Sequence, residues 1–247
     1  MSGIKNGGRS LTKVNLGAVY FQADEKKCLK FFEQILEARF KETHKGSLSE
    51  LKNMLGEHEN DKKFGKYICS LKRPGDARFY GFKLLCRLCS GDVSYIIELL
   101  NLITAGSWDK PKQKISPMEQ DKVAKNFTQR QLASLQNIAE YGTKLYEFSS
   151  RLGNLLKQYL LNSKNEETAD ERLRIEIEGE GELSQEAQKI HDKLLEHSVL
   201  IPGGSGKDKK GLPTRKLFFR RLYAPCFPFS PTRKGCIPLK IKEYEEW

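Results

Sequence analysis

The sequence predicts a mainly helical protein followed by a smaller domain of mixed helices and strands. Three observations favour this fold class. Apolar residues recur at intervals of three and four from Glu25 to Tyr159, strict alternation of apolar and polar residues begins only at Leu173, and a basic, Gly-rich stretch after Gly203 separates two strand-like runs. The chain has 247 residues, of which 38% are hydrophobic, so it has enough apolar material for a core.

The first predicted domain covers residues 22–140 and follows a flexible or detached start at residues 1–21, which are polar and Gly-rich. Ser47 and Ser116 each precede a glutamate three residues further on, which is the spacing of a capping box. Asp76 is predicted to cap another helix of this domain. The helices are expected at residues 25–40, 47–56, 76–89, 92–103 and 116–140.

The second predicted domain covers residues 141–240. Its elements are expected, in order, as a helix at 145–159, a strand at 173–177, a helix at 184–195, a strand at 199–201, a turn at 203–213 and a strand at 216–223. This order is that of a winged helix-turn-helix domain, with residues 203–215 as the wing. The prolines that follow exclude a continuous helix or a central strand, so we expect Phe227 and Phe229 to pin an extended segment onto the domain. Residues 241–247 are typical of the beginning of a helix that is cut short, as in a fragment of a longer protein.

Composition and charge exclude several classes of protein. The chain carries 43 Lys and Arg against 32 Asp and Glu, a net charge of +11, which favours an anionic partner and above all nucleic acid. No run approaches the roughly 18 apolar residues of a membrane-spanning helix, and the first residues lack the apolar core of a signal peptide. We therefore expect a cytoplasmic protein with no membrane partner. Six cysteines are too few for a disulfide scaffold, which indicates reduced thiols.

Basic residues are concentrated in one part of the second domain. Residues 203–242 contain eleven bases and one acid, a net charge of +10, whereas residues 164–198 contain eleven acids and five bases, a net charge of −6. This contrast predicts that the wing and the strand after it contact the phosphate backbone of duplex DNA. The predicted contact residues are Lys207, Lys209, Lys210, Arg215, Lys216, Arg220, Arg221, Arg233 and Lys234.

The helix expected at residues 184–195 occupies the position of a recognition helix. Lys189 and Lys193 are its candidate DNA contacts, but Glu186, Asp192 and Glu196 accompany them. An acidic helix enters the major groove poorly, so we expect binding that is led by the wing and falls steeply with salt.

No catalytic, metal or cofactor site is predicted. The Gly203–Lys207 loop lacks the spacing and the following hydroxyl of a nucleotide-binding phosphate loop, so a wing is favoured over a nucleotide site. Cys86 and Cys89 have the spacing of half a zinc site, but Cys226 and Cys236 are too far apart to complete it, so small buried residues are favoured over zinc ligands. Four glutamates are interpreted as a solvated face rather than a metal site: Glu176, Glu178, Glu180 and Glu182. The four histidines are interpreted as surface or helix-end residues rather than metal ligands or catalytic groups: His44, His58, His191 and His197.

A short part of the first domain resembles a known family. The residues Arg78-Phe79, Leu88-Cys89-Ser90-Gly91-Asp92-Val93-Ser94 and Ile97-Glu98-Leu99-Leu100 are similar to the helical lid of AAA+ ATPases of the origin-recognition and replication-initiator type. In that lid a Ser-Gly-Asp turn opens the helix that carries the sensor-2 arginine, and this chain has no arginine at Val93 or Ser94. The resemblance extends from about Glu25 to Tyr223, and the ATP-binding core of the family is absent from the chain.

The resemblance implies the lid and DNA-binding portion of an initiator-like ATPase. We therefore expect a non-catalytic module that binds duplex DNA, needs no cofactor and works with a separate AAA+ core. The alternative is a protein-interaction adaptor, or a regulator that docks on a separate ATPase, as the resemblance allows for mobile-element and antiphage systems.

Overall fold

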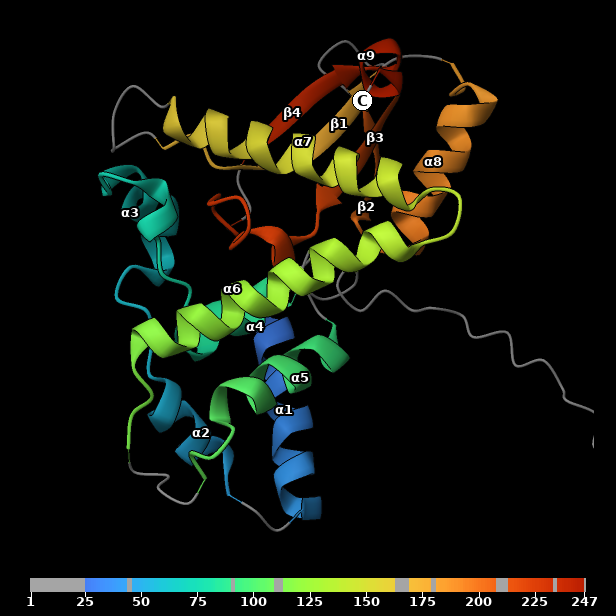
Figure 1. The fold of residues 1–247 in the computed structure, drawn as a ribbon. Helices are drawn as coiled ribbons and strands as arrows, with labels where there is room; N and C mark the ends of the chain where they lie inside the picture. Colours follow the sequence, from blue (N-terminus) through green and yellow to red (C-terminus); the bar gives the residue numbers. More distant parts are fainter. Residues whose placement is uncertain are drawn as a thin grey trace, which may run out of the picture.

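The computed structural model describes residues 25–43, 46–89, 92–108, 113–162, 169–178, 181–207, 213–232 and 235–246 (Figure 1). Helices make up most of this part of the chain, and a small sheet lies near its C-terminal end. No helix in the described ranges is long and apolar enough to cross a membrane. The predicted start at residues 1–21 lies outside these ranges.

The first half of the chain is helical, as predicted. Ser47 and Ser116 cap their helices by accepting hydrogen bonds from the backbone N–H groups of Glu50 and Glu119, both at 3.2 Å, which confirms the two predicted helix starts. The α3 helix was not predicted. The helices are α1 (Glu25–Thr43), α2 (Leu48–Leu55), α3 (Phe64–Ser70), α4 (Phe82–Leu88), α5 (Val93–Thr104) and α6 (Pro117–Ser134).

The predicted helix at residues 76–89 is wrong in its first part. Asp76 ends a 3-10 turn at Pro74–Asp76, and the chain then runs without helical structure to Gly81, whose φ of 88° is a left-handed value that suits glycine. Side chains of α6 satisfy the backbone of this segment: Phe79 N donates to the Asp121 carboxylate at 2.8 Å. Phe79 is therefore buried without belonging to a helix, although it lies within the range predicted as one.

The second half contains the sheet. Its strands pair in the order β2-β3-β1-β4, with β1 antiparallel to β3 and parallel to β4, and α7 lies across the sheet (Figure 1). Ser184 caps α8 by accepting a hydrogen bond from Ala187 N, as predicted. The elements are α7 (Gly142–Leu161), β1 (Arg172–Glu178), α8 (Gln185–Glu196), β2 (Leu200–Lys207), β3 (Pro213–Phe219), β4 (Gly235–Lys240) and α9 (Ile241–Glu245).

Several element bounds differ from the expected ones. The α6 helix ends at Ser134 rather than near residue 140 and continues as a 3-10 turn, Leu135–Asn137. The returning strand ends at Phe219, because the chain then enters another 3-10 turn, Arg221–Tyr223. The β4 strand was not predicted, but as an edge strand it accommodates Pro238, in agreement with the exclusion of a central strand.

The architecture is therefore a helical layer joined to a small mixed sheet with its own helices. The predicted order of helix, strand, helix and two-stranded hairpin is confirmed over α7, β1, α8, β2 and β3. Two features set it apart from the simplest winged helix-turn-helix. In the described part between β1 and β2 there is one helix, α8, and β4 adds a parallel edge to the sheet.

One cluster of buried side chains extends through both predicted domains. It includes Phe32 and Phe127 from the helical half and Phe219 and Phe229 from the sheet half. The Pro-rich segment is pinned as predicted: Phe229 is fully buried, and the Phe227 ring lies so close to Gly153 of α7 that a Cβ there would be 2.3 Å from it. The domain boundary near residue 140 stays a prediction.

Candidate nucleic-acid interface

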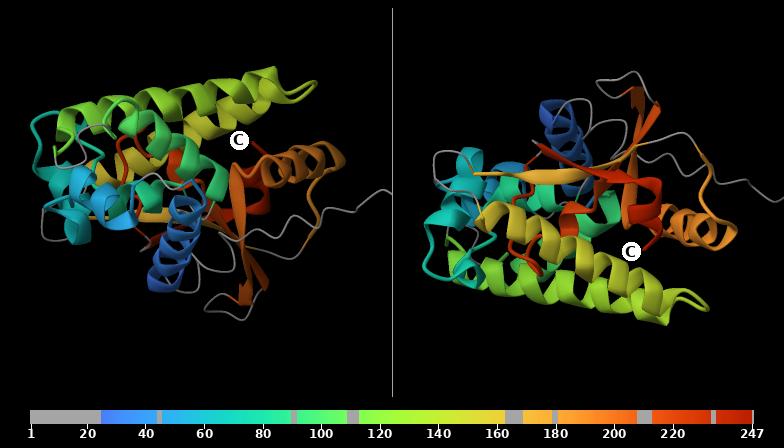
Figure 2. Two further views of the ribbon diagram at one scale, coloured as in Figure 1. Left: turned by 90° about the horizontal axis from the view of Figure 1, so that it is seen from below. Right: turned by 90° about the horizontal axis from the view of Figure 1, so that it is seen from above.

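The β2–β3 hairpin carries the predicted wing. Its base pairs regularly from Leu200 with Phe219 to Pro202 with Leu217, the register then shifts, and pairing resumes from Ser205 with Arg215 to Lys207 with Pro213. Much of the expected turn is therefore strand. Figure 2 shows that the far end of this hairpin extends beyond the helices of the body.

The register shift lies where a glycine is required. A Cβ on Gly203 would come within 2.4 Å of the Phe218 ring on the neighbouring strand. Glycine therefore permits the close approach of the two strands, and the irregularity at this point changes the course of the hairpin toward its far end.

The predicted contacts at the far end lie close together in the register. Lys207 is the last residue of β2 and pairs with Pro213 of β3. Arg215 lies two residues after Pro213 along β3. The Arg215 side chain is exposed. Four further predicted contacts fall outside the described residues: Lys209, Lys210, Arg233 and Lys234.

Lys216 belongs to a mixed-charge row on one face of the sheet. It faces Glu176 across the β1–β3 pair, with Lys216 Nζ 3.9 Å from the Glu176 carboxylate, which also binds the Arg174 guanidinium at 2.8 Å. The Arg174 guanidinium in turn lies 6.0 Å from the centre of the Phe218 ring. The acidic strand and the basic strand, separate in the sequence, are thus neighbours, and Lys216 has an anionic partner within the chain.

Arg220 joins the end of β3 to the beginning of α5. Its side chain is 7% exposed, and its guanidinium lies 2.9 Å from the Asp92 carboxylate and 4.4 Å from the centre of the Tyr95 ring. Asp92 also caps α5 by accepting hydrogen bonds from Ser94 N at 3.0 Å and Tyr95 N at 3.3 Å. The contact therefore links the sheet half to the helical half through one buried guanidinium.

Arg221 is also buried, at 6% exposure, next to Arg220 in the 3-10 turn. Tyr223 in the same turn is buried, and burial raises its pKa to about 12. That Arg220 and Arg221 contact DNA stays a prediction. Their burial gives both residues a place in the core between the two halves.

The α8 helix presents a surface of alternating charge. Lys189 is exposed, Lys193 is 2.8 Å from the Glu196 carboxylate, and Glu186 binds Lys144 of α7. Two of the acids that disfavour this helix as a reader of bases are thus already engaged with lysines on the protein surface.

Two histidines expected at the surface are buried instead. His191 of α8 is 6% exposed and its Nδ1 lies 2.8 Å from the Tyr244 hydroxyl of α9. His58 is 5% exposed, accepts a hydrogen bond from Asn60 N at 3.0 Å and lies 3.1 Å from Arg78 O. Burial lowers the pKa of both imidazoles. The expectation was wrong because contacts distant in the sequence, such as that with Tyr244, cover the rings.

The cysteines are free thiols, as predicted, and two of them are deep in the core. Cys86 and Cys89 are at most 1% exposed, and burial raises the pKa of both thiols. They behave as small apolar residues. Within the described residues, no group of three or more His, Cys, Asp or Glu side chains is arranged to hold a metal ion.

Two residues shape this surface through contacts that sequence reasoning missed. Glu176 alternates with apolar residues as a solvated strand residue would, and only the pairing register places it beside Lys216. Asp92 was predicted as a helix opener, which it is, but its contact with Arg220 spans 128 residues. Neither contact has a local signal.

Comparison with known proteins places the chain beside a described family. A family model described as ORC-CDC6-like matches residues 61–239, nearly three quarters of the chain. Comparisons with curated proteins and with solved structures gave no match.

Proposed function

Because the chain belongs to the ORC-CDC6-like family, we propose that it is the DNA-binding, non-catalytic module of an initiator-like ATPase. In this proposal the far end of the β2–β3 hairpin acts as a basic wing on the backbone of duplex DNA. A DNA partner favours an intracellular location, in line with the cytoplasmic one expected from the sequence.

One observation carries the proposal. Along the hairpin, basic residues near the base are engaged within the chain, Lys216 with Glu176 and Arg220 with Asp92, whereas Arg215 toward the far end is exposed. Lys207 ends β2 at the same end, and Lys209 and Lys210 follow it in the sequence. An exposed cation such as Arg215 can approach a phosphate with little rearrangement, which favours its use in DNA binding.

Binding to the backbone rather than to bases is the form of contact that this surface supports. A helix that reads the major groove presents donors and apolar groups to base edges, whereas α8 carries Glu186, Asp192 and Glu196. Phosphate contacts position a protein on DNA without reading its sequence. We therefore expect little sequence preference.

The other parts of the chain follow from the family. We propose that residues 22–140 act as a lid-like domain and that residues 141–240 act as a variant winged helix, with β2–β3 as wing. We further propose that ATP hydrolysis belongs to a separate AAA+ core, because the given sequence contains no phosphate-binding loop that ends in Gly-Lys-Ser or Gly-Lys-Thr.

Charge reversal at the wing tests the proposal. The double variant Lys209→Glu/Lys210→Glu should weaken binding to a labelled random duplex by about tenfold or more at low salt, measured by fluorescence anisotropy. The matched control is Lys62→Glu/Lys63→Glu, which reverses two exposed lysines on the 3-10 turn before α3. Equal binding by the wing variant and the wild type would contradict the wing assignment.

A second function is favoured by the paired charges. Glu176 and Asp92 neutralise two of the predicted DNA contacts, Lys216 and Arg220. Fewer unpaired cations are then left for phosphates, and paired charges at a surface suit contact with a protein partner. The alternative is an adaptor or regulator that docks on a separate ATPase. Absence of duplex binding at low salt, together with complex formation with an AAA+ core, would favour it.

A further inference from the structure

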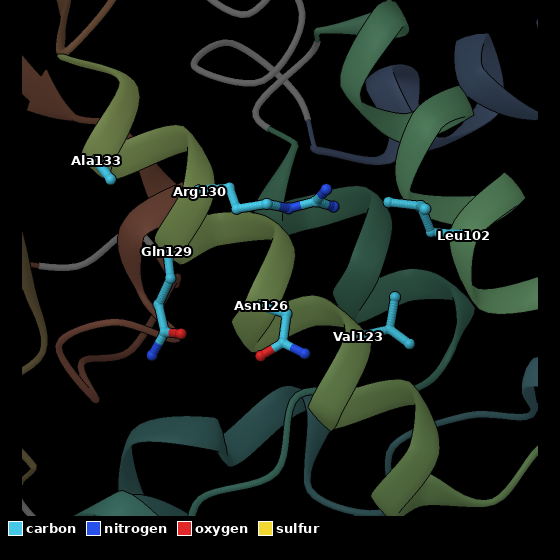
Figure 3. Close-up of a pocket in the computed structure, with 6 residues that line it drawn as sticks. All are labelled: Leu102, Val123, Asn126, Gln129, Arg130 and Ala133. Atoms are coloured by element: carbon cyan, nitrogen blue, oxygen red, sulfur yellow. The ribbon is translucent and has the colours of Figure 1, made fainter. Parts of the chain in front are cut away.

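A groove runs between α5 and α6, away from the residues used in the proposed wing. Its volume is about 640 Å³, and its lining consists of Leu102 from α5 and five residues of α6. Figure 3 shows these side chains along the groove, with Leu102 on one wall and the α6 residues on the other. The α6 residues are Val123, Asn126, Gln129, Arg130 and Ala133.

The groove exposes apolar side chains from both helices. Leu102 is 37% exposed, and Val123 and Ala133 line the same hollow from α6. The other large hydrophobic side chains that are exposed in the described residues, Met118 in the first turn of α6 and Leu161 on α7, do not line the groove. Apolar groups beside a hollow, with polar residues around them, are typical of a protein-binding surface.

The length of the groove fits a helix. The lining residues of α6 run from Val123 to Ala133, which is about 15 Å along the helix axis at about 1.5 Å per residue. This is about three turns, enough to receive the i, i+3 or i+4, and i+7 side chains of a partner helix. A third, amphipathic helix can pack into the hollow between two neighbouring helices.

The charge on the α6 wall selects the partner. Residues 122–133 contain three bases and no acid. Lys122 and Arg130 are exposed, whereas Lys125 pairs with the Asp121 carboxylate at 2.9 Å. Arg130 lines the groove itself. On the opposite helix, exposed Glu98 lies one turn before Leu102, so the two walls differ in charge and favour one orientation of the partner.

We infer that the α5–α6 groove is a docking site for an amphipathic, acidic helix of a partner protein. The apolar side chains of that helix would cover Leu102 and Val123, and its carboxylates would lie along the α6 wall beside Lys122 and Arg130. The inference concerns a second surface and does not depend on the DNA contact of the hairpin.

Designed peptides test the inference on the full chain. The probe is a labelled 18-residue helical peptide with leucines at i, i+3, i+4 and i+7 spacing and glutamates on its flanks, and the comparison peptide carries lysines in place of the glutamates. The acidic peptide should bind at least about tenfold more tightly than the basic one in fluorescence anisotropy. Val123→Glu, which places a negative charge on the α6 wall of the groove, should abolish binding of the acidic peptide.

A charge swap separates docking from a general effect of folding. Arg130→Glu should weaken the acidic peptide and strengthen the basic one, whereas Leu161→Glu, the control on α7, should change neither. Equal binding of both peptides, or retention of the acidic peptide by Val123→Glu with an unchanged circular dichroism spectrum, would overturn the inference. Loss of duplex DNA binding in Arg130→Glu with no change in peptide binding would also overturn it, because the groove would then be a nucleic-acid surface.

Discussion

The contact between Arg220 and Asp92 should couple the two halves of the protein energetically. Arg220→Met removes the guanidinium and keeps most of the apolar stem. The lost charge-assisted hydrogen bond at 2.9 Å is worth about 1.5–3 kcal/mol and the stacking on Tyr95 at 4.4 Å about 0.5–2 kcal/mol. Because Asp92 is 35% exposed, solvent screens part of this, and we expect a loss of about 2–3 kcal/mol in the free energy of unfolding.

A double-mutant cycle isolates the pair. Asp92→Asn removes the carboxylate charge but keeps a residue that caps helices about as well, so the start of α5 is preserved. The cycle of Arg220→Met with Asp92→Asn, followed by urea unfolding, should give a coupling energy of about 1–2 kcal/mol. The value should fall at higher salt, since Asp92 is partly exposed.

Additive effects in this cycle, within about 0.5 kcal/mol, would refute the reasoning. The same variant also tests the sequence-based prediction that Arg220 contacts DNA. If the guanidinium serves only to hold β3 against α5, Arg220→Met should bind a random duplex as the wild type does, at a temperature where both are folded. A loss of DNA affinity in the folded variant would instead assign Arg220 to the interface.

Three further predictions follow from burial and close approach. Gly203→Ala should destabilise the protein by about 1–3 kcal/mol in thermal unfolding, because its Cβ would meet a ring at 2.4 Å, whereas Gly75→Ala, with open space around it, should have little effect. The lowered pKa of His191 means that the folded state favours the neutral ring. The contribution of this histidine to the free energy of unfolding is therefore fully present above its ordinary pKa of 6.5 and is lost as the pH falls below that value. His191→Gln should flatten this dependence of the urea midpoint between pH 7.5 and pH 5, and an unchanged slope would contradict the assignment. Cys86 and Cys89 should resist iodoacetamide in the native protein and react after unfolding, as mass spectrometry would show.

Much of the fold was predictable because its signals are local. Ser47, Ser116 and Ser184 cap the helices that their spacing indicated, since a cap depends on residues three positions apart. The alternation around Ile175 likewise identified β1, whose residues are buried in strict alternation. The helix predicted after Asp76 failed because α6 side chains, and not a helical ladder, satisfy the backbone there.

The candidate site was less predictable because its electrostatics depend on long-range register. Lys216 was predicted as a DNA contact from its place in the basic stretch, but the antiparallel pairing of β3 with β1 places Glu176 beside it. The β4 strand was missed for a related reason. Ile237 and Leu239 alternate with Pro238 and Lys240, but the prolines argued against a strand there. Because β4 pairs with β1 in parallel, no hairpin turn marks it either.

The salt dependence of DNA affinity tests the central claim most directly. With Lys207, Lys209, Lys210 and Arg215 on phosphates, the logarithm of affinity should fall with the logarithm of salt with a slope of about −3.6, or about a hundredfold between about 50 and 200 mM salt. Lys209→Glu/Lys210→Glu should reduce that slope by about 2. A wild-type slope near zero, or a slope that the double variant leaves unchanged, would contradict a DNA-binding wing.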